Sequence, residues 1–231
     1  MTDPGADVSA RLARFAELVD GDAAAVPVDE AALALAAVLR PATDVEGAMS
    51  GLDRLAAGCP ERTFDGLRGY LFDNVGFRGD REHYDDPQNS FLDLVLARRT
   101  GLPILLATVM LEVGRRAAIP VVGIGMPMHF LVRAGDDPDR FADPFSGQAV
   151  GADDAQRMLE TLSQGQLRWD ARYLEPVDPR AIVTRMLANL FAGYRRRGDP
   201  VRLALVAKMR AAIPELRAEA TAAARLGAIF N

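Results

Sequence analysis

Two side chains that could act as a proton-transfer pair, His129 and Asp143, stand fourteen residues apart in the middle of the chain. Strand-like periodicity over 129–133 and 140–143, with a polar turn between, predicts a hairpin centred on Asp136. In that register His129 faces Asp143, and opposed residues on neighbouring strands have Cβ atoms roughly 4.5–5.5 Å apart. A carboxylate so placed orients the imidazole and favours its charged form, as in a general base. A slip of one residue would turn the pair to opposite faces.

A nucleophile to accompany this pair is not obvious. Cys59 is the only cysteine, which excludes an intramolecular disulfide and a zinc cluster built on thiolates. Its neighbours Gly58 and Pro60 indicate the end of a helix. Ser90 is a second candidate, but its position before an apolar run is typical of a helix N-cap.

A metal site would have to combine His129 and Asp143 with His83 or with carboxylates such as Asp85 and Asp86. Their spacings match no specific ligand pattern. We therefore expect neither a metal nor a cofactor.

The elements that must position these residues are mainly helical. Four short helices are expected between Val8 and Asn74, and a central buried helix over 103–118 that begins with Pro103. The polar stretch 77–88 predicts no element. The remaining expectations are a helix from about Phe91 to Thr100 that Gly101 ends, strands over 121–125, 129–133 and 140–143, a helix over 152–163, a strand or extended connector over 167–173, and helices over 180–197, 201–212 and from Pro214.

Length and composition are those of an ordinary globular protein. With 231 residues, 49% hydrophobic and 26% charged, the chain fits one full domain with a smaller appended unit. The apolar runs, such as 104–110, are far shorter than the roughly 20 residues that cross a bilayer. No secretory signal follows Met1, so we expect a cytoplasmic protein without a membrane partner.

Charge is distributed unevenly. The net charge is −5, yet ten basic and only three acidic residues follow from Arg180 onward. Such a basic helical tail could bind nucleic acid or an acidic partner, or it could present a solvated helix face. We favour the solvated face.

Several motifs carry a resemblance to a known family. They are Asp86–Leu92, Arg98–Ile104, Leu111–Arg116, Pro127–Leu131 and Asp143–Phe145. Together they resemble the transglutaminase-like superfamily, and more closely its bacterial SirB-type branch, over roughly residues 68–148. Farther on, Arg185–Leu190 with Tyr194 and Gly198-Asp199 resembles the tetratricopeptide-like helical tail that this branch often carries.

The resemblance implies a Cys-His-Asp triad, with His129 and Asp143 as its second and third members. The nucleophile position falls at Pro103 or next to it, and neither Pro103 nor Ile104 can attack a substrate. The family places its cysteine at the start of the buried helix, where the helix dipole favours the thiolate. What remains is a dyad without an attacking sulfur.

We therefore expect an α+β, mainly helical protein with a transglutaminase-like, papain-like core and a small antiparallel sheet. Residues 1–178 would form this domain with its helical N-terminal segment, and residues 179–231 a tetratricopeptide-like tail that binds a protein partner. The expected function is non-catalytic binding or regulation. One alternative is a hydrolase or transferase in which His129, oriented by Asp143, activates water or a hydroxyl directly. Another is a buried pair that only holds the hairpin together.

Overall fold

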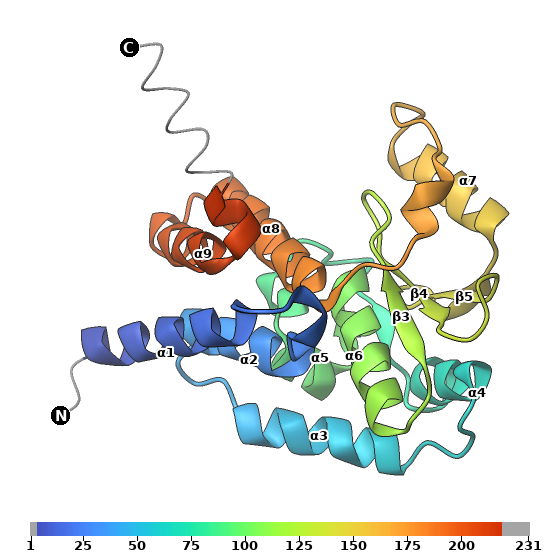
Figure 1. The fold of residues 1–231 in the computed structure, drawn as a ribbon, viewed down its shortest axis with the longest axis horizontal. Helices are drawn as coiled ribbons and strands as arrows, with labels where there is room; N and C mark the ends of the chain where they lie inside the picture. Colours follow the sequence, from blue (N-terminus) through green and yellow to red (C-terminus); the bar gives the residue numbers. More distant parts are fainter. Residues whose placement is uncertain (1–3, 219–231) are drawn as a thin grey trace. The chain divides into compact units, whose positions relative to one another are not determined.

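The computed structural model describes residues 4–218, and Figure 1 shows how their helices and strands are arranged. Contacts divide the chain into two compact units. One combines residues up to Thr43 with those from Pro179 onward, and the other spans Asp44–Asp178. The predicted boundary at 178/179 coincides with one break between the units, and the structure adds a second break after Thr43. The assignment of 1–178 and 179–231 to two domain families stays a prediction.

The first unit is a bundle of helices from both ends of the chain. Helix α1 packs against α2, α8 against α9, and both N-terminal helices contact the C-terminal pair. Asp199 accepts a hydrogen bond from the backbone N–H of Arg202 and caps α9, after Gly198 turns the chain with a φ of 64°. The helices whose two ends are both described are α1 (Pro4–Val19), η1 (Ala23–Ala25), α2 (Val28–Leu39), α8 (Pro179–Arg197) and α9 (Pro200–Ala212).

Arg180 at the start of α8 connects three segments of this unit. Its guanidinium donates to the carbonyl of Gly21 at 2.7 Å and to that of Val19 at 3.4 Å, and it forms an ion pair with Glu215. These bonds satisfy carbonyls at and beyond the end of α1 that lack a partner within that helix. The helix predicted from Pro214 begins there and continues to the last described residue; its remainder lies outside the described residues.

The second unit contains the remaining helices and all described strands. They are α3 (Val45–Ala57), α4 (Phe64–Arg68), a π-helical turn η2 (Gly69–Asn74), β1 (Arg78–Gly79), η3 (Pro87–Ser90), α5 (Leu92–Arg98), β2 (Thr100–Gly101), α6 (Pro103–Arg116), β3 (Val121–Ile124), β4 (Leu131–Ala134), β5 (Phe141–Asp143), β6 (Gln148–Val150), α7 (Ala152–Leu162) and η4 (Ala171–Leu174). The protein is therefore mainly helical with little sheet, and the predicted α+β class is confirmed.

Strands β3, β4, β5 and β6 form an antiparallel sheet in that order, and β1 pairs with β2 in a separate parallel ladder. Val122 and Ile124 point from β3 into a cluster that includes Leu159 of α7. The side chain of Val121, which must point the other way, lies against Gly114 of α6. Helices α6 and α7 therefore cover opposite faces of the sheet (Figure 1).

Helix α6 is the predicted buried helix, with Pro103 at its first position. Its residues are buried almost throughout the first two turns. Near its end the buried Glu112 forms ion pairs with Arg115 and Arg116 at 2.9 and 2.8 Å, and Arg116 also reaches Asp53 of α3 at 2.8 Å. This cluster explains the motif at 111–116 as an attachment between two helices.

Both predicted end signals of the helix at 91–100 are wrong. Ser90 ends η3 and Phe91 is the N-cap of α5, without a side-chain hydrogen bond. Arg99, not Gly101, takes the left-handed conformation that ends α5, with a φ of 55°. Gly101 instead belongs to β2, where its missing Cβ leaves room for Val95. Strand β1, the partner of β2, lies within the stretch 77–88, for which no element was predicted. The turn η3 begins at the end of the same stretch.

The predicted hairpin register is wrong by two residues. Arg133 pairs with Phe141 rather than with Asp139, so the turn is centred on Asp137 and not on Asp136. The Asp137 carboxylate accepts a hydrogen bond from the N–H of Asp139, an Asx turn that moves the centre. Because the shift in partner is even, the faces of the side chains are preserved.

Three smaller differences concern the ends of the sheet. Strand β6 was not predicted. The strand or connector expected over 167–173 ends in the short helix η4, and Pro176 rather than this segment forms an isolated bridge with Ile124.

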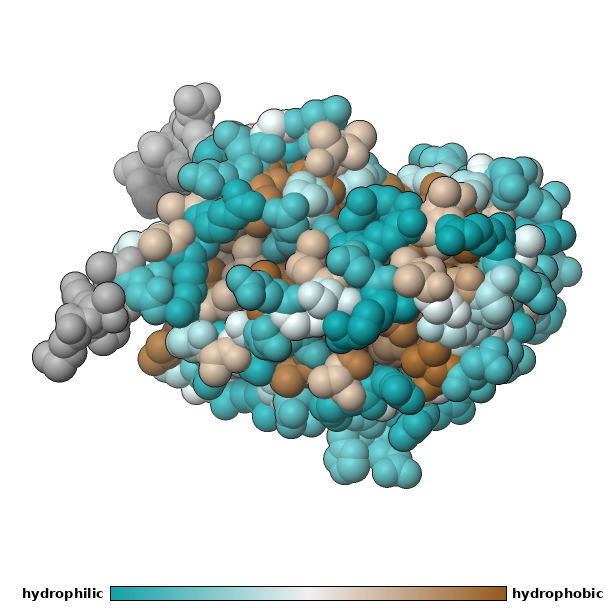
Figure 2. Space-filling model, turned by 90° about the horizontal axis from the view of Figure 1, so that it is seen from below, coloured by the Kyte–Doolittle hydropathy of each residue, from teal (hydrophilic) through white to brown (hydrophobic). Residues whose placement is uncertain are grey.

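Within residues 4–218 no helix is both long and apolar enough to cross a membrane. The face drawn in Figure 2 is largely hydrophilic with smaller apolar patches.

Candidate functional site

The side chains of His129 and Asp143 meet in the second unit. The Nε2 atom of His129 lies 2.7 Å from Oδ1 of Asp143, and both residues are buried. The sequence pattern predicts them as opposed residues of two strands. In the structure His129 is not a strand residue, because it precedes the first residue of β4. The structure thus brings the two predicted residues together by a different route.

The Asp143 carboxylate is held by the turn that follows β5. Its Oδ1 accepts the N–H of Phe145 at 2.9 Å and its Oδ2 accepts the N–H of Ser146 at 3.2 Å. Burial acts to raise the pKa of Asp143, but the hydrogen bonds from His129, Ser146 and Phe145 outweigh it, so that the pKa lies below its ordinary value. Asp143 is therefore a fixed anion at neutral pH.

His129 is aimed at this anion by a tight turn. Its N–H donates to the carbonyl of Met126 at 3.2 Å, with Pro127 second in the turn and Met128 third at a φ of 64°. Proline followed by a positive φ is the signature of a type II turn, and a residue other than glycine in that position is uncommon. A turn thus presents the imidazole, and Met128, which precedes His129 in this turn, is exposed.

The contact with Asp143 determines which ring nitrogen can act on a ligand. An ionised carboxylate only accepts hydrogen bonds, so Nε2 of the neutral ring carries the hydrogen. In the part of the chain that the structure describes, Nδ1 has no hydrogen-bond partner. The arrangement can therefore accept a proton at Nδ1, or a hydrogen bond from a ligand.

Phe145 links the dyad to β1. Its ring meets His129 edge to face with centroids 6.2 Å apart, and meets Tyr84 with centroids 5.8 Å apart. Its carbonyl accepts the N–H of Gly79 at 2.9 Å. Gly79 was not predicted to have a role, because its only signal in the sequence is that of a glycine inside a polar stretch.

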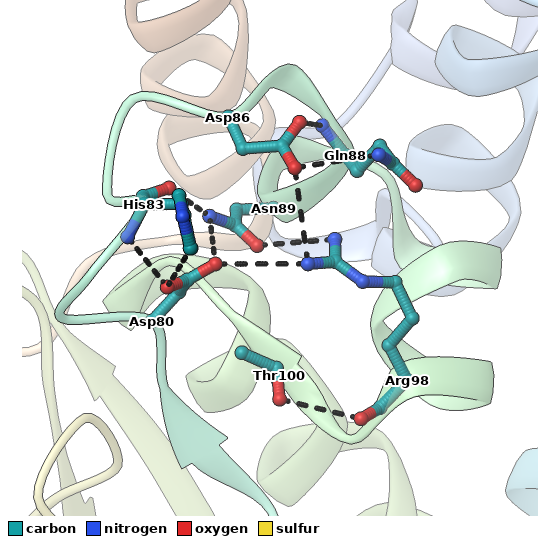
Figure 3. Close-up of polar contacts among 7 residues, drawn as sticks. All are labelled: Asp80, His83, Asp86, Gln88, Asn89, Arg98 and Thr100. Atoms are coloured by element: carbon teal, nitrogen blue, oxygen red, sulfur yellow. Dashed lines mark hydrogen bonds and ion pairs between the residues drawn. The ribbon is translucent and has the colours of Figure 1, made fainter.

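A polar network, drawn in Figure 3, fixes the segment beside the dyad. The fully buried Asn89 donates from Nδ2 to Asp80 Oδ2 at 3.0 Å and to the carbonyl of His83 at 2.8 Å, and accepts from Arg98 at 3.2 Å. Arg98 also lies 3.6 Å from Asp80 and 3.9 Å from Asp86. Arg98 is thus held by an amide oxygen and two carboxylates, and Asn89 is the buried centre of the network.

The charge of Asp80 is stabilised inside this network. Burial acts to raise the pKa of Asp80, but the backbone N–H of His83, the Asn89 amide and the charge of Arg98 more than offset it and leave the pKa below its ordinary value. The N–H of Asp80 also donates to Gly101 at 3.4 Å. Sequence reasoning missed this network because its members come from a loop, from η3 and from α5, which only the fold brings together.

The network reaches the start of α6, where the resemblance places the nucleophile. Asn89 accepts the N–H of Leu102 at 3.0 Å through its carbonyl, and Leu102 is the N-cap of α6. Pro103 and Ile104 follow, both buried. No thiol or hydroxyl stands at these positions.

The two alternative nucleophiles lie elsewhere. Cys59 is buried between α3 and α4, where its Sγ lies 3.3 Å from the carbonyl of Glu61, and burial raises the pKa of its thiol. A raised pKa reduces the thiolate fraction and with it the reactivity. Ser90 is the last residue of η3.

The residues weighed for a metal have other partners. Asp86 caps η3 through the N–H of Gln88 at 2.9 Å, and the exposed His83 ring lies 3.8 Å from Asp80. Among residues 4–218 no group of three or more His, Cys, Asp or Glu side chains is placed to hold a metal ion.

Comparison with known proteins yields one family. The model of the transglutaminase-like superfamily matches residues 28–188. A UPF0162 protein of Vibrio cholerae is 33% identical over 190 residues, which are 78% of this chain and 70% of the relative. A UPF0162 protein of Xylella fastidiosa is 39% identical over 130 residues, 54% of this chain and 46% of the relative, so the chain spans about half the length of that relative.

A short stretch also matches a eukaryotic protein. The F-box only protein 21 of Mus musculus is 35% identical over 72 residues, which are 31% of this chain and 12% of that protein. No solved structure matches the chain.

Proposed function

The chain belongs to the transglutaminase-like superfamily, and on that premise we propose that it binds a ligand or partner without forming a covalent intermediate. The observation that carries the proposal is the start of α6, where Pro103 occupies the position that the resemblance gives to the nucleophile. The one cysteine is buried, and its thiol has a raised pKa. A dyad without a nucleophile can still recognise a hydrogen-bond donor.

The binding element in this proposal is Nδ1 of His129. Its partner Asp143 orients the ring through Nε2, and Phe145 packs edge-on against it. Met128, 54% exposed, precedes His129 in the turn and is an apolar side chain that a ligand can contact. This combination suits a polar group that donates to Nδ1 and is flanked by apolar atoms.

The second candidate is a hydrolase or transferase in which Nδ1 takes a proton from water or from a substrate hydroxyl. The fixed, ionised Asp143 favours it, because such a carboxylate stabilises the imidazolium that forms. General-base assistance alone gives roughly 10²–10⁴-fold, so this enzyme would need further stabilisation of the transition state. We rank it second for that reason.

We also propose a branch of the superfamily and a partner for this protein. The motifs favour the SirB-type branch, the α8–α9 pair favours a tetratricopeptide-like unit that binds protein, and we place the protein in the cytoplasm. Truncation at Pro179 is a poor test of this partner, because it removes helices that pack on α1 and α2. Arg195→Glu is the better variant, because Arg195 is an exposed residue of α8 and its replacement should keep the packing of the bundle.

The non-covalent claim is tested by alkylation. The intact protein is treated with iodoacetamide and with a chloromethyl ketone that mimics glutamine, both folded and in guanidinium chloride, and its mass is measured. We expect no adduct in the folded protein and one adduct, on Cys59, in the unfolded protein. An adduct on the folded protein that the His129→Ala substitution abolishes would contradict the proposal.

The binding claim is tested by capture. Immobilised wild type is compared with Met128→Arg, in the turn that carries His129, and with Val45→Arg, a matched exposed position at the start of α3. We expect Met128→Arg to lose a bound species that Val45→Arg retains. An identical set of captured species on all three proteins would contradict the claim, and hydrolysis of 4-nitrophenyl acetate that depends on His129 would favour the second candidate.

A further inference from the structure

Strand β6 forms an edge of the four-stranded sheet. It pairs with β5 on one side, and within residues 4–218 no strand pairs with its other side. The alternation of the ladder determines which groups point outward. The backbone N–H of Ala134 donates to the carbonyl of Arg140 at 3.0 Å. The backbone N–H and C=O groups of Arg140 and Ala142 therefore point toward β4, and those of Phe141 point toward β6.

The residue that presents its backbone outward on β6 is Ala149. Its neighbours Gln148 and Val150 pair with Asp143 and Phe141, which direct their own backbone groups toward β6. The N–H and C=O of Ala149 therefore point away from the sheet, and Ala149 is exposed. An unpaired donor and acceptor on an edge strand form a template for another extended segment.

Two hollows meet at this edge. One, of about 470 Å³, is lined by Phe141, Gly151 and charged residues, and the other, of about 500 Å³, lies between β6 and α7. Ala149 and Val150 line both hollows. A single extended ligand lying along β6 would thus place side chains in both.

The α7 side of this surface is apolar in part. Met158 and Leu162 line the hollow there together with Thr161, and Leu162 is 39% exposed. Positions 158 and 162 are one helical turn apart, so the two side chains lie side by side on α7. This wall suits a small apolar side chain of a ligand.

The other side of the surface is acidic. Asp65, Asp137 and Asp139 line the first hollow with Arg140, whose guanidinium lies 3.2 Å from Asp65 and 3.3 Å from Asp137. In the second hollow Asp154 pairs with Arg157 at 2.5 Å. Four carboxylates against two guanidinium groups leave an excess of two negative charges, which favours a basic ligand.

From the outward backbone of Ala149 and the acidic and apolar hollows on either hand, we propose that β6 adds a strand from a basic, extended peptide segment of another protein. Backbone hydrogen bonds to Ala149 supply affinity, and alternate side chains supply specificity. An apolar side chain enters the α7 hollow, and a lysine or arginine side chain meets Asp139 and its neighbours. This surface is separate from Nδ1 of His129, so its test does not depend on the proposed function.

The test uses the full chain and two fluorescein-labelled octapeptides, Thr-Val-Lys-Val-Lys-Val-Lys-Thr and the same peptide with glutamate in place of lysine. We expect the lysine peptide to bind by fluorescence polarisation and to shift the backbone amide signal of Ala149 in a ¹H–¹⁵N spectrum. The glutamate peptide binds at least about tenfold more weakly. Equal binding of the two peptides, or no binding of the lysine peptide, overturns the proposal.

Three variants locate the binding. Ala149→Pro removes the outward N–H and is tolerated at an edge that faces solvent, so it weakens binding roughly tenfold while the fold is kept. Asp139→Lys weakens binding by a similar factor, and Glu160→Lys, the matched change away from the hollows on α7, alters it less than about twofold. If Ala149→Pro fails to fold, Asp139→Lys against Glu160→Lys still decides.

A second copy of this chain is the competing occupant. Sedimentation equilibrium measures the mass of the wild type and of Ala149→Pro. A monomer for both agrees with the proposal. A dimer that Ala149→Pro dissociates would assign the edge to self-association and overturn it.

Discussion

A Cβ atom on Gly79 would lie 2.2 Å from Cδ2 of Phe145, so these two residues fit together only because Gly79 has no side chain. The same Phe145 ring packs against His129 and follows Asp143 by two residues in the turn that holds the carboxylate. Gly79 of strand β1 thus determines where Phe145 packs and, through Phe145, where the dyad lies, although it is far from both in the sequence.

Gly79→Ala is therefore expected to destabilise the protein by about 1–3 kcal/mol, because it overpacks the site. It should also displace Phe145, which NMR detects as a change in the ring-proton shifts of His129. The control is Gly51→Ala in α3, where an added Cβ meets only ordinary contacts and the free energy of unfolding should rise by about 0.5–1 kcal/mol. Equal effects of the two substitutions would show that the Phe145 contact is unimportant.

Asp143 should make stability depend on pH in a defined direction. Its folded pKa is lowered, so the carboxylate stabilises the fold above the unfolded pKa of about 3.9, and this contribution disappears as pH falls through the lower folded pKa. Asp143→Asn should cost about 1–3 kcal/mol at pH 7. Urea unfolding of both proteins between pH 7 and pH 2.5 should show the gap narrowing below about pH 4.

The matched control is Glu82→Gln, an exposed carboxyl in the loop before η3. It should alter the free energy of unfolding by less than about 0.5 kcal/mol at either end of the range. A gap between wild type and Asp143→Asn that stays constant from pH 7 to pH 2.5 would refute the account of this carboxylate.

Removal of the Asn89 amide should be costly. Asn89→Ala leaves the buried Asp80 and the carbonyl of His83 without their amide donor, which we expect to cost about 2–4 kcal/mol in urea unfolding. The neighbouring Gln88→Ala removes only an exposed hydrogen bond to Asp86 at the edge of the network, and it should cost less than about 0.5 kcal/mol. Similar costs for both would mean that the network drawn in Figure 3 does not hold this segment.

In the first unit, Arg180 connects the start of α8 to the end of α1 and to Glu215. Arg180→Ala removes two hydrogen bonds to carbonyls near the end of α1 and the ion pair with Glu215, with an expected cost of about 2–3 kcal/mol. Lys208→Ala, on the exposed side of α9, serves as control and should have little effect. Hydrogen exchange that stays unchanged at the end of α1 in Arg180→Ala would contradict this assignment.

The elements that sequence predicts best are those whose signal is local. Pro103 and the apolar residues behind it specify a buried helix wherever they occur, and the structure begins α6 at that proline. The same holds for the break between the helices predicted over 180–197 and 201–212, where the chain turns at Gly198 and Asp199 caps α9. The α+β class follows from such segments.

What the sequence could not supply depends on contacts between distant segments. Arg99 takes a left-handed conformation that glycine adopts more readily, while Gly101 is needed against Val95. The Asx turn at Asp137 moves the centre of the hairpin away from Asp136, yet His129 still contacts Asp143. The contact forms because His129 lies in a turn and not in a strand. The pair was therefore predicted from a register that the structure does not have.

A thiol at Pro103, the position that the resemblance gives to the nucleophile, should act together with His129 and Asp143. The variant Pro103→Cys in a Cys59→Ser background restores a thiol at the first turn of α6, where the helix dipole favours the thiolate. We expect iodoacetamide to alkylate it at pH 7 about tenfold faster than a thiol with an ordinary pKa, and a further His129→Ala substitution to remove most of that gain. An alkylation rate that His129→Ala leaves unchanged would contradict the claim.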